Sequence, residues 1–233
     1  MSALPAEKLE KEVVTSALKG RRPQARSLER RKKIMDAARE LITLKSVSSL
    51  SLYDIARKAE IPPSSLYHFF PKIELLFQAL AEESFAAFDA CVSEPLPPQA
   101  VHHWSDVGYT LEARMVQYYQ QNDMARALIL GQHLHSDILA ADHKHDDRIG
   151  KQIEQIYRQY FQLPPLPEGY NIFAIALQIA DKVYAMSHQE YGNITPAMAC
   201  EGWLAARSYL GIYLPDQLQR AKQAEGLDMA EHF

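Results

Sequence analysis

Three polar side chains, Ser64, Tyr67 and His68, are spaced so that they share one side of a helix. The Ser hydroxyl, the Tyr phenol and the His imidazole all form hydrogen bonds. Such groups bond phosphate oxygens or the edges of bases, and a small serine beside them leaves room for close approach. The predicted chemistry is hydrogen bonding to a polyanion.

A short helix has to present these groups. Pro62 stands before Pro63 and is therefore biased toward extended backbone, while Pro63 suits the first helical position, where its missing N–H is no loss. Leu66, Phe69 and Phe70 then fall on the side opposite the polar groups. A helix of about two turns is unstable alone in water, so its apolar side must pack on neighbouring helices.

Two helices before this element provide that support. Residues 27–45 carry an apolar stripe that predicts a first helix, and Ser51 is placed to cap a second one. Leu52, Ile55 and Ala56 begin the apolar side of that second helix. Two short helices joined by a tight turn indicate a helix-turn-helix. A three-helix packing unit without a ligand is the alternative.

The distribution of charge favours the DNA-binding alternative. Residues 1–72 hold 15 Lys and Arg against 8 Asp and Glu, whereas the rest of the chain carries the acidic excess that brings the net charge to −4. The first 26 residues end in KGRRPQAR, with Arg21, Arg22 and Arg26. We expect Gly20 and Pro23 to interrupt any helix there and to leave a flexible basic arm.

The remaining chain is predicted to be helical, because no stretch shows the alternation of a strand. Further helices are expected over 73–92, 104–121, 123–139, 146–162, 170–190 and 195–214. The predicted class is all-α, with an N-terminal three-helix DNA-binding unit followed by a larger helical domain. The predicted segments are a basic arm (1–26), the helix-turn-helix domain (27–72), the larger helical domain (73–214) and a C-terminal tail (215–233).

The stretch from Ser51 to Leu80, SLYDIARKAEIPPSSLYHFFPKIELLFQAL, resembles the signature of TetR-type transcriptional regulators. In that family a Thr or Ser caps the second helix, Ile-Ala follows, and a Leu-Tyr pair stands three residues before a Phe. The resemblance implies a regulator, most often a repressor, that binds a palindromic DNA operator as a dimer and is released by a small molecule. The DNA contacts that it implies are Ser51, Ser64, Ser65, Tyr67, His68 and Lys72, with the arm residues Arg21, Arg22 and Arg26 beside them.

Three positions depart from the family pattern. Glu60 stands in the turn where the family has Gly, so keeping a left-handed backbone there is expected to cost about 1–2 kcal/mol. Pro62 replaces the usual capping Ser, and Ile73 stands where the family has a Lys, with Lys72 one place earlier.

The family resemblance also implies that residues 73–214, the acidic part of the chain, form a helical ligand-binding (effector-binding) and dimerisation domain. The apolar helices 170–190 and 195–214 are expected to pair with those of a second copy in a homodimer, although both are also compatible with plain core. The helices between them and the DNA-binding unit are expected to surround an effector cavity. Candidate lining residues are Trp104, Tyr109, Tyr118, His133 and Tyr184.

The segment HLHSD…DHKHDD places His133, His135, His143 and His145 among aspartates, which is a composition that suits zinc or nickel. Histidines at i, i+2 on a helix point apart, however, so no metal and no cofactor is predicted.

A metal-dependent helical enzyme is the rival class, but nucleophile motifs and Gly-rich phosphate loops are missing from the sequence. A DNA-binding protein of the same fold without an effector is a third reading. The N-terminus lacks the apolar core of a signal peptide and no apolar run reaches the length of a membrane span, so we expect a cytoplasmic protein.

Overall fold

The structure is a computed structural model, and it describes residues 6–131 and 136–221, with the side chains of residues 25–97, 99–131 and 141–221. The chain divides into two compact units, Met1–Ile73 and Glu74–Phe233. Over the described residues the backbone is helical between its turns, apart from one isolated β-bridge that pairs Phe161 with Arg220. The predicted all-α class is confirmed. None of the described helices has the length and apolar character needed to cross a membrane.

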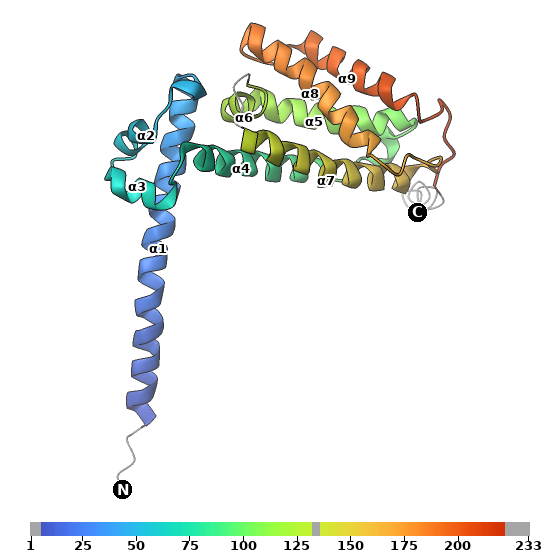
Figure 1. Cartoon of the computed structure of the whole chain (residues 1–233). Helices are drawn as coiled ribbons and strands as arrows, with labels where there is room; N and C mark the ends of the chain where they lie inside the picture. Colours follow the sequence, from blue (N-terminus) through green and yellow to red (C-terminus); the bar gives the residue numbers. More distant parts are fainter. Residues whose placement is uncertain (1–5, 132–135, 222–233) are drawn as a thin grey trace. The chain divides into compact units, whose positions relative to one another are not determined.

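The first unit holds three α-helices and one 3₁₀ turn (Figure 1). They are α1 (Ala6–Leu44), η1 (Val47–Ser49), α2 (Leu52–Lys58) and α3 (Pro63–Phe69). Helix α2 packs on both α1 and α3. The core of the unit consists of the apolar stripes that the sequence predicts, with Ile34, Ala38, Leu41 and Ile42 of α1 meeting Leu52, Ile55, Ala56, Leu66 and Phe70.

Helix α1 is longer than predicted. Its backbone is helical without interruption from Ala6 to Leu44, through both Gly20 and Pro23. In a helix interior Gly costs about 1 kcal/mol and Pro about 3 kcal/mol relative to Ala. The residues around these two positions are strong helix formers such as Leu, Lys, Arg, Gln and Ala, which add little further cost. The predicted interruption is therefore wrong for the backbone, whereas the flexibility of residues 1–26 stays a prediction.

The turn between α2 and α3 has the geometry that a helix-turn-helix requires. Ser51 caps α2, because its hydroxyl accepts a hydrogen bond from the backbone N–H of Asp54 at 3.2 Å. Glu60 adopts a left-handed backbone with φ of 56°. Pro62 stands in extended backbone before α3 and makes no side-chain cap. The left-handed turn is thus kept with a residue that carries a Cβ atom.

Replacing Glu60 by Gly is expected to stabilise the protein. The left-handed conformation costs a residue with a Cβ roughly 1–2 kcal/mol, and Gly avoids this cost. Gly also gives the unfolded chain more conformational freedom, which cancels part of the increase in stability. We expect a net rise of up to about 1 kcal/mol in the free energy of unfolding, measured by urea denaturation. Glu60→Ala is the matched control, because it removes the same side chain and keeps the strain. Equal stability of the two variants would show that this turn stores no strain.

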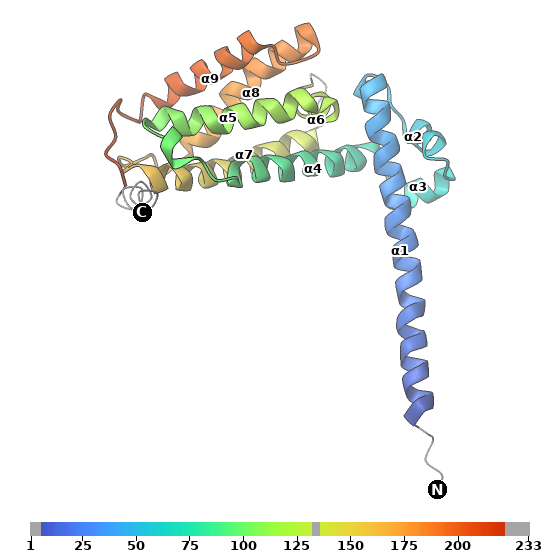
Figure 2. The same ribbon diagram turned by 180° about the vertical axis from the view of Figure 1, so that it is seen from behind.

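The second unit is a helical bundle. Its elements are α4 (Ile73–Ser93), η2 (Pro98–Ala100), α5 (Trp104–Gln121), α6 (Asp123–Ile129), α7 (Ser136–Tyr160), α8 (Ile172–Tyr191) and α9 (Pro196–Leu210). Helix α8 packs along α7 and α9, and α5 contacts α6, α7 and α9. Figures 1 and 2 show α9 on the outer side of α8, with α5 and α7 on the inner side. Helix α4 also contributes to the interior of the bundle, where its Phe77, Phe85 and Phe88 are buried.

The break between α6 and α7 differs from the prediction of helices over 123–139 and 146–162. Helix α6 ends at Ile129 and α7 begins at Ser136. At Gly131 the chain folds back so closely that a Cβ atom would lie 2.3 Å from the carbonyl oxygen of Ala127, which explains why the helix ends in front of a glycine. His143 and His145 consequently lie within α7 rather than in a turn.

The first part of the predicted tail is fastened to the second unit. The backbone N–H of Gln162 donates to the carbonyl of Gln219 at 2.8 Å, and that of Ala221 donates to the carbonyl of Tyr160 at 2.9 Å. The Arg220 guanidinium donates to the carbonyl of Val101 at 2.7 Å. Residues 215–221 therefore belong structurally to the bundle, and residues 222–233 lie outside the described part.

Candidate nucleic-acid interface and ligand cavity

Helix α3 separates its two faces as the sequence predicts. Ser64, Tyr67 and His68 are exposed, with 51% of the Tyr67 surface open to solvent. Leu66 is fully buried and Phe70 is 4% exposed, so both anchor the helix from below. A hydroxyl, a phenol and an imidazole thus stand side by side on a rigid, solvent-facing surface. This face, formed by Ser64, Tyr67 and His68, is called the α3 face below.

Several predicted contact residues surround the α3 face. Lys72 and Arg26 are exposed and Ser65 is half-buried. The side chains of Arg21 and Arg22 lie outside the described part. The guanidinium of Arg31 lies 5.6 Å from the centre of the Phe70 ring, which places a cation over the aromatic anchor of α3.

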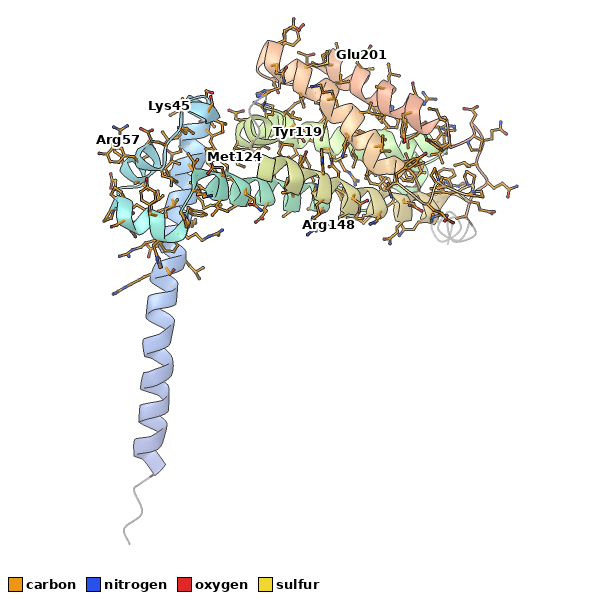
Figure 3. The ribbon with its side chains drawn as sticks, viewed as in Figure 1. Lys45, Arg57, Tyr119, Met124, Arg148 and Glu201 are labelled. Atoms are coloured by element: carbon orange, nitrogen blue, oxygen red, sulfur yellow. The ribbon has the colours of Figure 1, made fainter. Side chains whose placement is uncertain are left out.

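Ser51 is exposed, but its hydroxyl is engaged within the protein. It donates to a carboxylate oxygen of Asp54 at 2.6 Å, and this hydrogen bond lowers the pKa of Asp54. Arg57 donates to the other oxygen of the same carboxylate at 3.0 Å. Figure 3 shows Arg57 on the outside of α2. A phosphate contact by the Ser51 hydroxyl would have to replace its bond to Asp54.

The second unit encloses a cavity between α4, α5, α7 and α8. The volume that the centre of a water molecule can occupy in this cavity is about 20 Å³, so the cavity holds about one water. Four carboxyl groups line it, together with one histidine and three aromatic rings. These residues are Glu112 of α5, Asp142, Asp146 and His145 of α7, Asp181 of α8, and the rings of Phe88, Tyr119 and Tyr184. The set formed by Glu112, Asp142, Asp146 and Asp181 is called the carboxyl cluster below.

Hydrogen bonds from tyrosines orient two members of the cluster. The Tyr184 hydroxyl donates to a Glu112 oxygen at 2.9 Å, and the Tyr119 hydroxyl donates to an Asp181 oxygen at 3.5 Å. Figure 3 places Tyr119 in the interior of the bundle. The Tyr184 ring comes so close to α9 that a Cβ atom at Gly202 would lie 2.2 Å from it. The ring can occupy this position because residue 202 is a glycine without a side chain.

Burial changes the acidity of these groups. It raises the pKa of Glu112 to about 7, and the hydrogen bond from Tyr184 opposes the rise only in part. It raises the pKa of Asp142 to about 6 and that of Asp146 to about 7, the latter with help from the neighbouring Asp142 charge. Burial, and then the charges of its acidic neighbours, hold the pKa of Asp181 well above its usual range. Near neutral pH the cluster therefore retains protons.

The aromatic residues predicted to line a cavity have different placements. Tyr184 lines the cavity of the carboxyl cluster. Trp104 is buried, and Tyr118 is half-buried, with its ring edge against Phe88 at 5.1 Å between centres. Tyr109 is 62% exposed on α5. The fifth predicted residue, His133, lies outside the described part.

The histidines considered for a metal do not converge. His143 is exposed, whereas His145 is buried and stacks on Phe85 with ring centres 4.5 Å apart. Burial lowers the pKa of His145. Within residues 25–131 and 141–221, no three His, Cys, Asp or Glu side chains are arranged to hold one metal ion. His135 lies outside this part.

The sequence reasoning missed the carboxyl cluster as a unit. Asp142 and Asp146 are among the aspartates of the histidine-rich segment HLHSD…DHKHDD, whereas Glu112 and Asp181 lie outside every motif described above. A usable signal was present, because Asp181 interrupts the apolar helix IFAIALQIADKVYAM. A charged residue on the buried side of an apolar helix is rare unless it is paired or functional.

Glu112→Gln is expected to remove part of the pH dependence of stability. Because the pKa of Glu112 rises from 4.5 to about 7 on folding, the folded state binds more protons between these values. The free energy of unfolding therefore falls as pH rises through that window, by roughly 3 kcal/mol for this group. Glutamine still accepts from Tyr184 and carries no charge. Urea denaturation at pH 5 and pH 8 should show a smaller loss in the variant.

The matched control is Glu201→Gln, because Glu201 is exposed on α9 (Figure 3). This variant should keep the pH dependence of the wild type. If Glu112→Gln also keeps it, the Glu112 carboxyl is not the source of the effect.

Comparison with known proteins bears on the first unit. Residues 34–80 match the family model described as bacterial regulatory proteins of the tetR family. This segment includes α2, α3 and the turn at Glu60. The family resemblance predicted from the sequence is thereby confirmed. Comparison with curated proteins gives no match.

Solved structures bear on the whole fold. The chain is similar to a TetR-family transcriptional regulator from Streptomyces coelicolor, with a TM-score of 0.61 and 20% identity over 79% of this chain and 99% of that one. It is similar to the multidrug binding protein EbrR complexed with imidazole (TM-score 0.54, 17% identity, 78% of this chain and 89% of that one). It is also similar to RolR in complex with resorcinol (TM-score 0.51, 14% identity, 90% and 97%). The predicted arrangement, a helix-turn-helix unit followed by a larger helical domain, is confirmed.

Proposed function

We propose that this chain, which matches the tetR family model over residues 34–80, is a sequence-specific transcriptional regulator that binds a palindromic DNA operator as a homodimer. The observation that carries the proposal is the exposed α3 face on a family-matched helix-turn-helix. Tyr67 contacts a phosphate, and His68 and Ser64 read base edges in the major groove. Selection of bound duplexes from a random pool tests this. Enrichment of a two-fold symmetric sequence is expected, and a pool without enrichment would contradict it.

An apolar surface on the outer helices supports the homodimer. Ile175, Ile179 and Val183 of α8 are half-buried in the single chain and follow one another at i, i+4 and i+8. Met186 continues this stripe with 52% exposure, and Leu204 of α9 is 42% exposed. These five residues, called the dimer stripe below, leave apolar surface on α8 and α9 in contact with water. A second copy that packs its own stripe against this one buries both surfaces and supplies the two-fold axis of a palindrome.

A cavity in the second unit supports release by a small molecule. EbrR and RolR, which share the fold, have structures with imidazole and resorcinol. The cavity of the carboxyl cluster has room for about one water, so a larger effector bound there must displace side chains or separate α5, α7 and α8. An effector that binds the opened bundle more tightly shifts the protein from the DNA-bound state, and a change from 1:99 to 99:1 needs about 5.5 kcal/mol of differential affinity. Repression relieved by the effector is the mode of action that we propose.

A DNA-binding protein of this fold without an effector is the second candidate. The small size of the cavity favours it. Thermal-shift screening of small molecules separates the two candidates when every stabilising compound is then tested for release of the selected operator. Stabilising compounds that release the operator support the effector. A screen in which no compound both binds and releases favours the second candidate.

Deleting residues 1–25 is expected to weaken DNA binding without changing the preferred sequence. The deleted segment contains Lys19, Arg21 and Arg22, and each phosphate that such a residue neutralises contributes about 0.9 to the slope of log affinity against log salt. The variant should therefore bind less tightly and with a flatter salt dependence, measured by fluorescence anisotropy. An unchanged slope would mean that the arm does not touch DNA.

A further inference from the structure

No lysine or arginine lines the cavity of the carboxyl cluster. The residues that line it include four carboxyl groups and one histidine, His145, and burial lowers the pKa of this histidine, so it adds little positive charge near neutral pH. Glu112 is 7% exposed and Asp146 is 5% exposed, so water screens neither of them well. Members of the cluster come from three helices: Glu112 from α5, Asp142 and Asp146 from α7, and Asp181 from α8. The folded bundle thus gathers acidic groups from distant parts of the chain into one enclosed space.

Such an arrangement is unfavourable for the protein alone. A buried carboxylate without a positive partner costs several kcal/mol, and like charges close together add to that cost. The empty protein reduces the cost by keeping protons on these groups. Apolar residues of the same size would have packed without any such penalty. The cluster is therefore explained more simply by a ligand that supplies positive charge than by a contribution to stability.

A second small cavity lies beside the one that holds the carboxyl cluster. The two are similar in size and share Glu112, Met115 and Leu177 as lining residues. Tyr157 lines this second cavity and is fully buried, and this burial, helped by the charge of Glu112, raises the pKa of its hydroxyl. The two cavities together give a ligand that opens the bundle a continuous set of side chains to displace.

The lining favours an organic cation over a metal ion. No three acidic, histidine or cysteine side chains in the described part converge on one metal position. Aromatic rings do line the cavity, with Phe88 and Tyr119 4.9 Å apart between ring centres and Tyr184 beside Glu112. Rings and carboxylates together bind an alkylated ammonium group, because the ring faces attract the cation and contact its methyl groups.

We infer that the effector of this protein is an organic cation, an alkylammonium or comparable amine, whose positive group lies among Glu112, Asp142, Asp146 and Asp181 next to the rings of Phe88, Tyr119 and Tyr184. This inference rests on the proposed release by a small molecule and adds the charge and class of the ligand. Entry of the cation displaces protons from the cluster and separates α5, α7 and α8, since the cavity holds only about one water when empty.

The test uses probes of equal shape and different charge on the full-length protein. Choline, 3,3-dimethylbutan-1-ol and 3,3-dimethylbutanoate present the same branched end as a cation, a neutral alcohol and an anion, and benzyltrimethylammonium adds an aromatic ring to the cation. Calorimetry should show that at least one of the two cations binds, and at least about tenfold more tightly than the alcohol and the anion.

Variants locate the site. Asp146→Asn and Asp181→Asn should each weaken cation binding at least about tenfold, because each removes a negative group from the cavity. Asp147→Asn is the matched control, since Asp147 neighbours Asp146 on α7 but is exposed and paired with Lys151 at 2.7 Å. Both cavity substitutions keep a side chain of the same size and make it permanently neutral, so the variants should fold at least as stably as the wild type.

The outcomes separate this inference from the proposed function. If the alcohol or the anion binds as tightly as the cations, or if neither cation binds at millimolar concentrations, the inference is wrong. If a cation binds in a manner that depends on Asp146 and Asp181 but the selected operator stays bound, the cation site is supported and the proposed release is contradicted. If 3,3-dimethylbutanoate releases the operator equally from wild type and Asp181→Asn, release is supported and the inference is overturned.

Discussion

Replacing Met186 and Leu204 together by glutamate is expected to turn the dimer into a monomer and to lower operator affinity by about a hundredfold or more. Both side chains are exposed in the single chain, at 52% and 42%, so the substitutions should leave each chain folded. In the dimer the stripe of one chain packs against the same stripe of the second chain. The double substitution therefore places four negative charges in one apolar contact. The monomer then binds one half-site and loses the gain in affinity that comes from joining two binding units.

Sedimentation at micromolar concentration and physiological salt measures the first effect, and anisotropy on the selected operator measures the second. Tyr109→Glu is the control, because Tyr109 is also an exposed large side chain of the second unit, at 62%, and lies on α5 outside the dimer stripe. It should remain dimeric. A wild-type protein that sediments as a monomer, or a double variant that stays a dimer, contradicts the assignment of this surface.

Substitutions on the α3 face are expected to weaken DNA binding in two distinguishable ways. Tyr67→Phe removes one hydroxyl, and as the loss of a phosphate contact it should weaken binding to all sequences alike by about 1–2 kcal/mol. His68→Ala removes a group that reads a base edge. It should cost about 1–3 kcal/mol on the operator and relax the preference at one position in each half-site. Anisotropy on the operator and on an unrelated duplex separates the two effects.

Phe70→Ala provides the comparison that separates folding from recognition. Phe70 is 4% exposed beneath α3, and emptying such a site typically costs 3–5 kcal/mol of stability. The melting temperature of the Phe70→Ala variant should fall. The melting temperatures of Tyr67→Phe and His68→Ala should stay close to that of the wild type, because both positions are exposed. If the two exposed variants bind the operator as tightly as the wild type, the α3 face does not meet DNA.

Local periodicity and caps explain why parts of the fold could be predicted. The spacing of Leu66 and Phe70 against Ser64, Tyr67 and His68 is a property of one helical segment, and the structure buries and exposes these side chains accordingly. Helix α5 spans the predicted residues 104–121, because a polar cap stands at each end. The left-handed backbone at Glu60 follows from the family turn into which this residue is placed.

Other features depend on contacts between distant residues. The hydrogen bond from Tyr184 to Glu112 joins positions 72 residues apart, and no spacing rule within a helix reports such a meeting. The end of α6 before Gly131 depends on how closely the chain folds back on Ala127. The bonds that fasten residues 215–221 reach Tyr160, Gln162 and Val101, so a polar, Gln-rich segment that reads as a tail becomes part of the bundle.

Methylation interference on the selected operator tests the central claim most directly, because it reports which groove edges the protein needs. The account predicts that methyl groups on guanine N7, in the major groove, block binding at two patches related by two-fold symmetry. Their centres should lie about 34 Å apart along the duplex, or a multiple of that distance, since two copies of α3 each enter one major groove. Interference confined to the minor groove, or a single patch without symmetry, would contradict recognition by paired α3 helices.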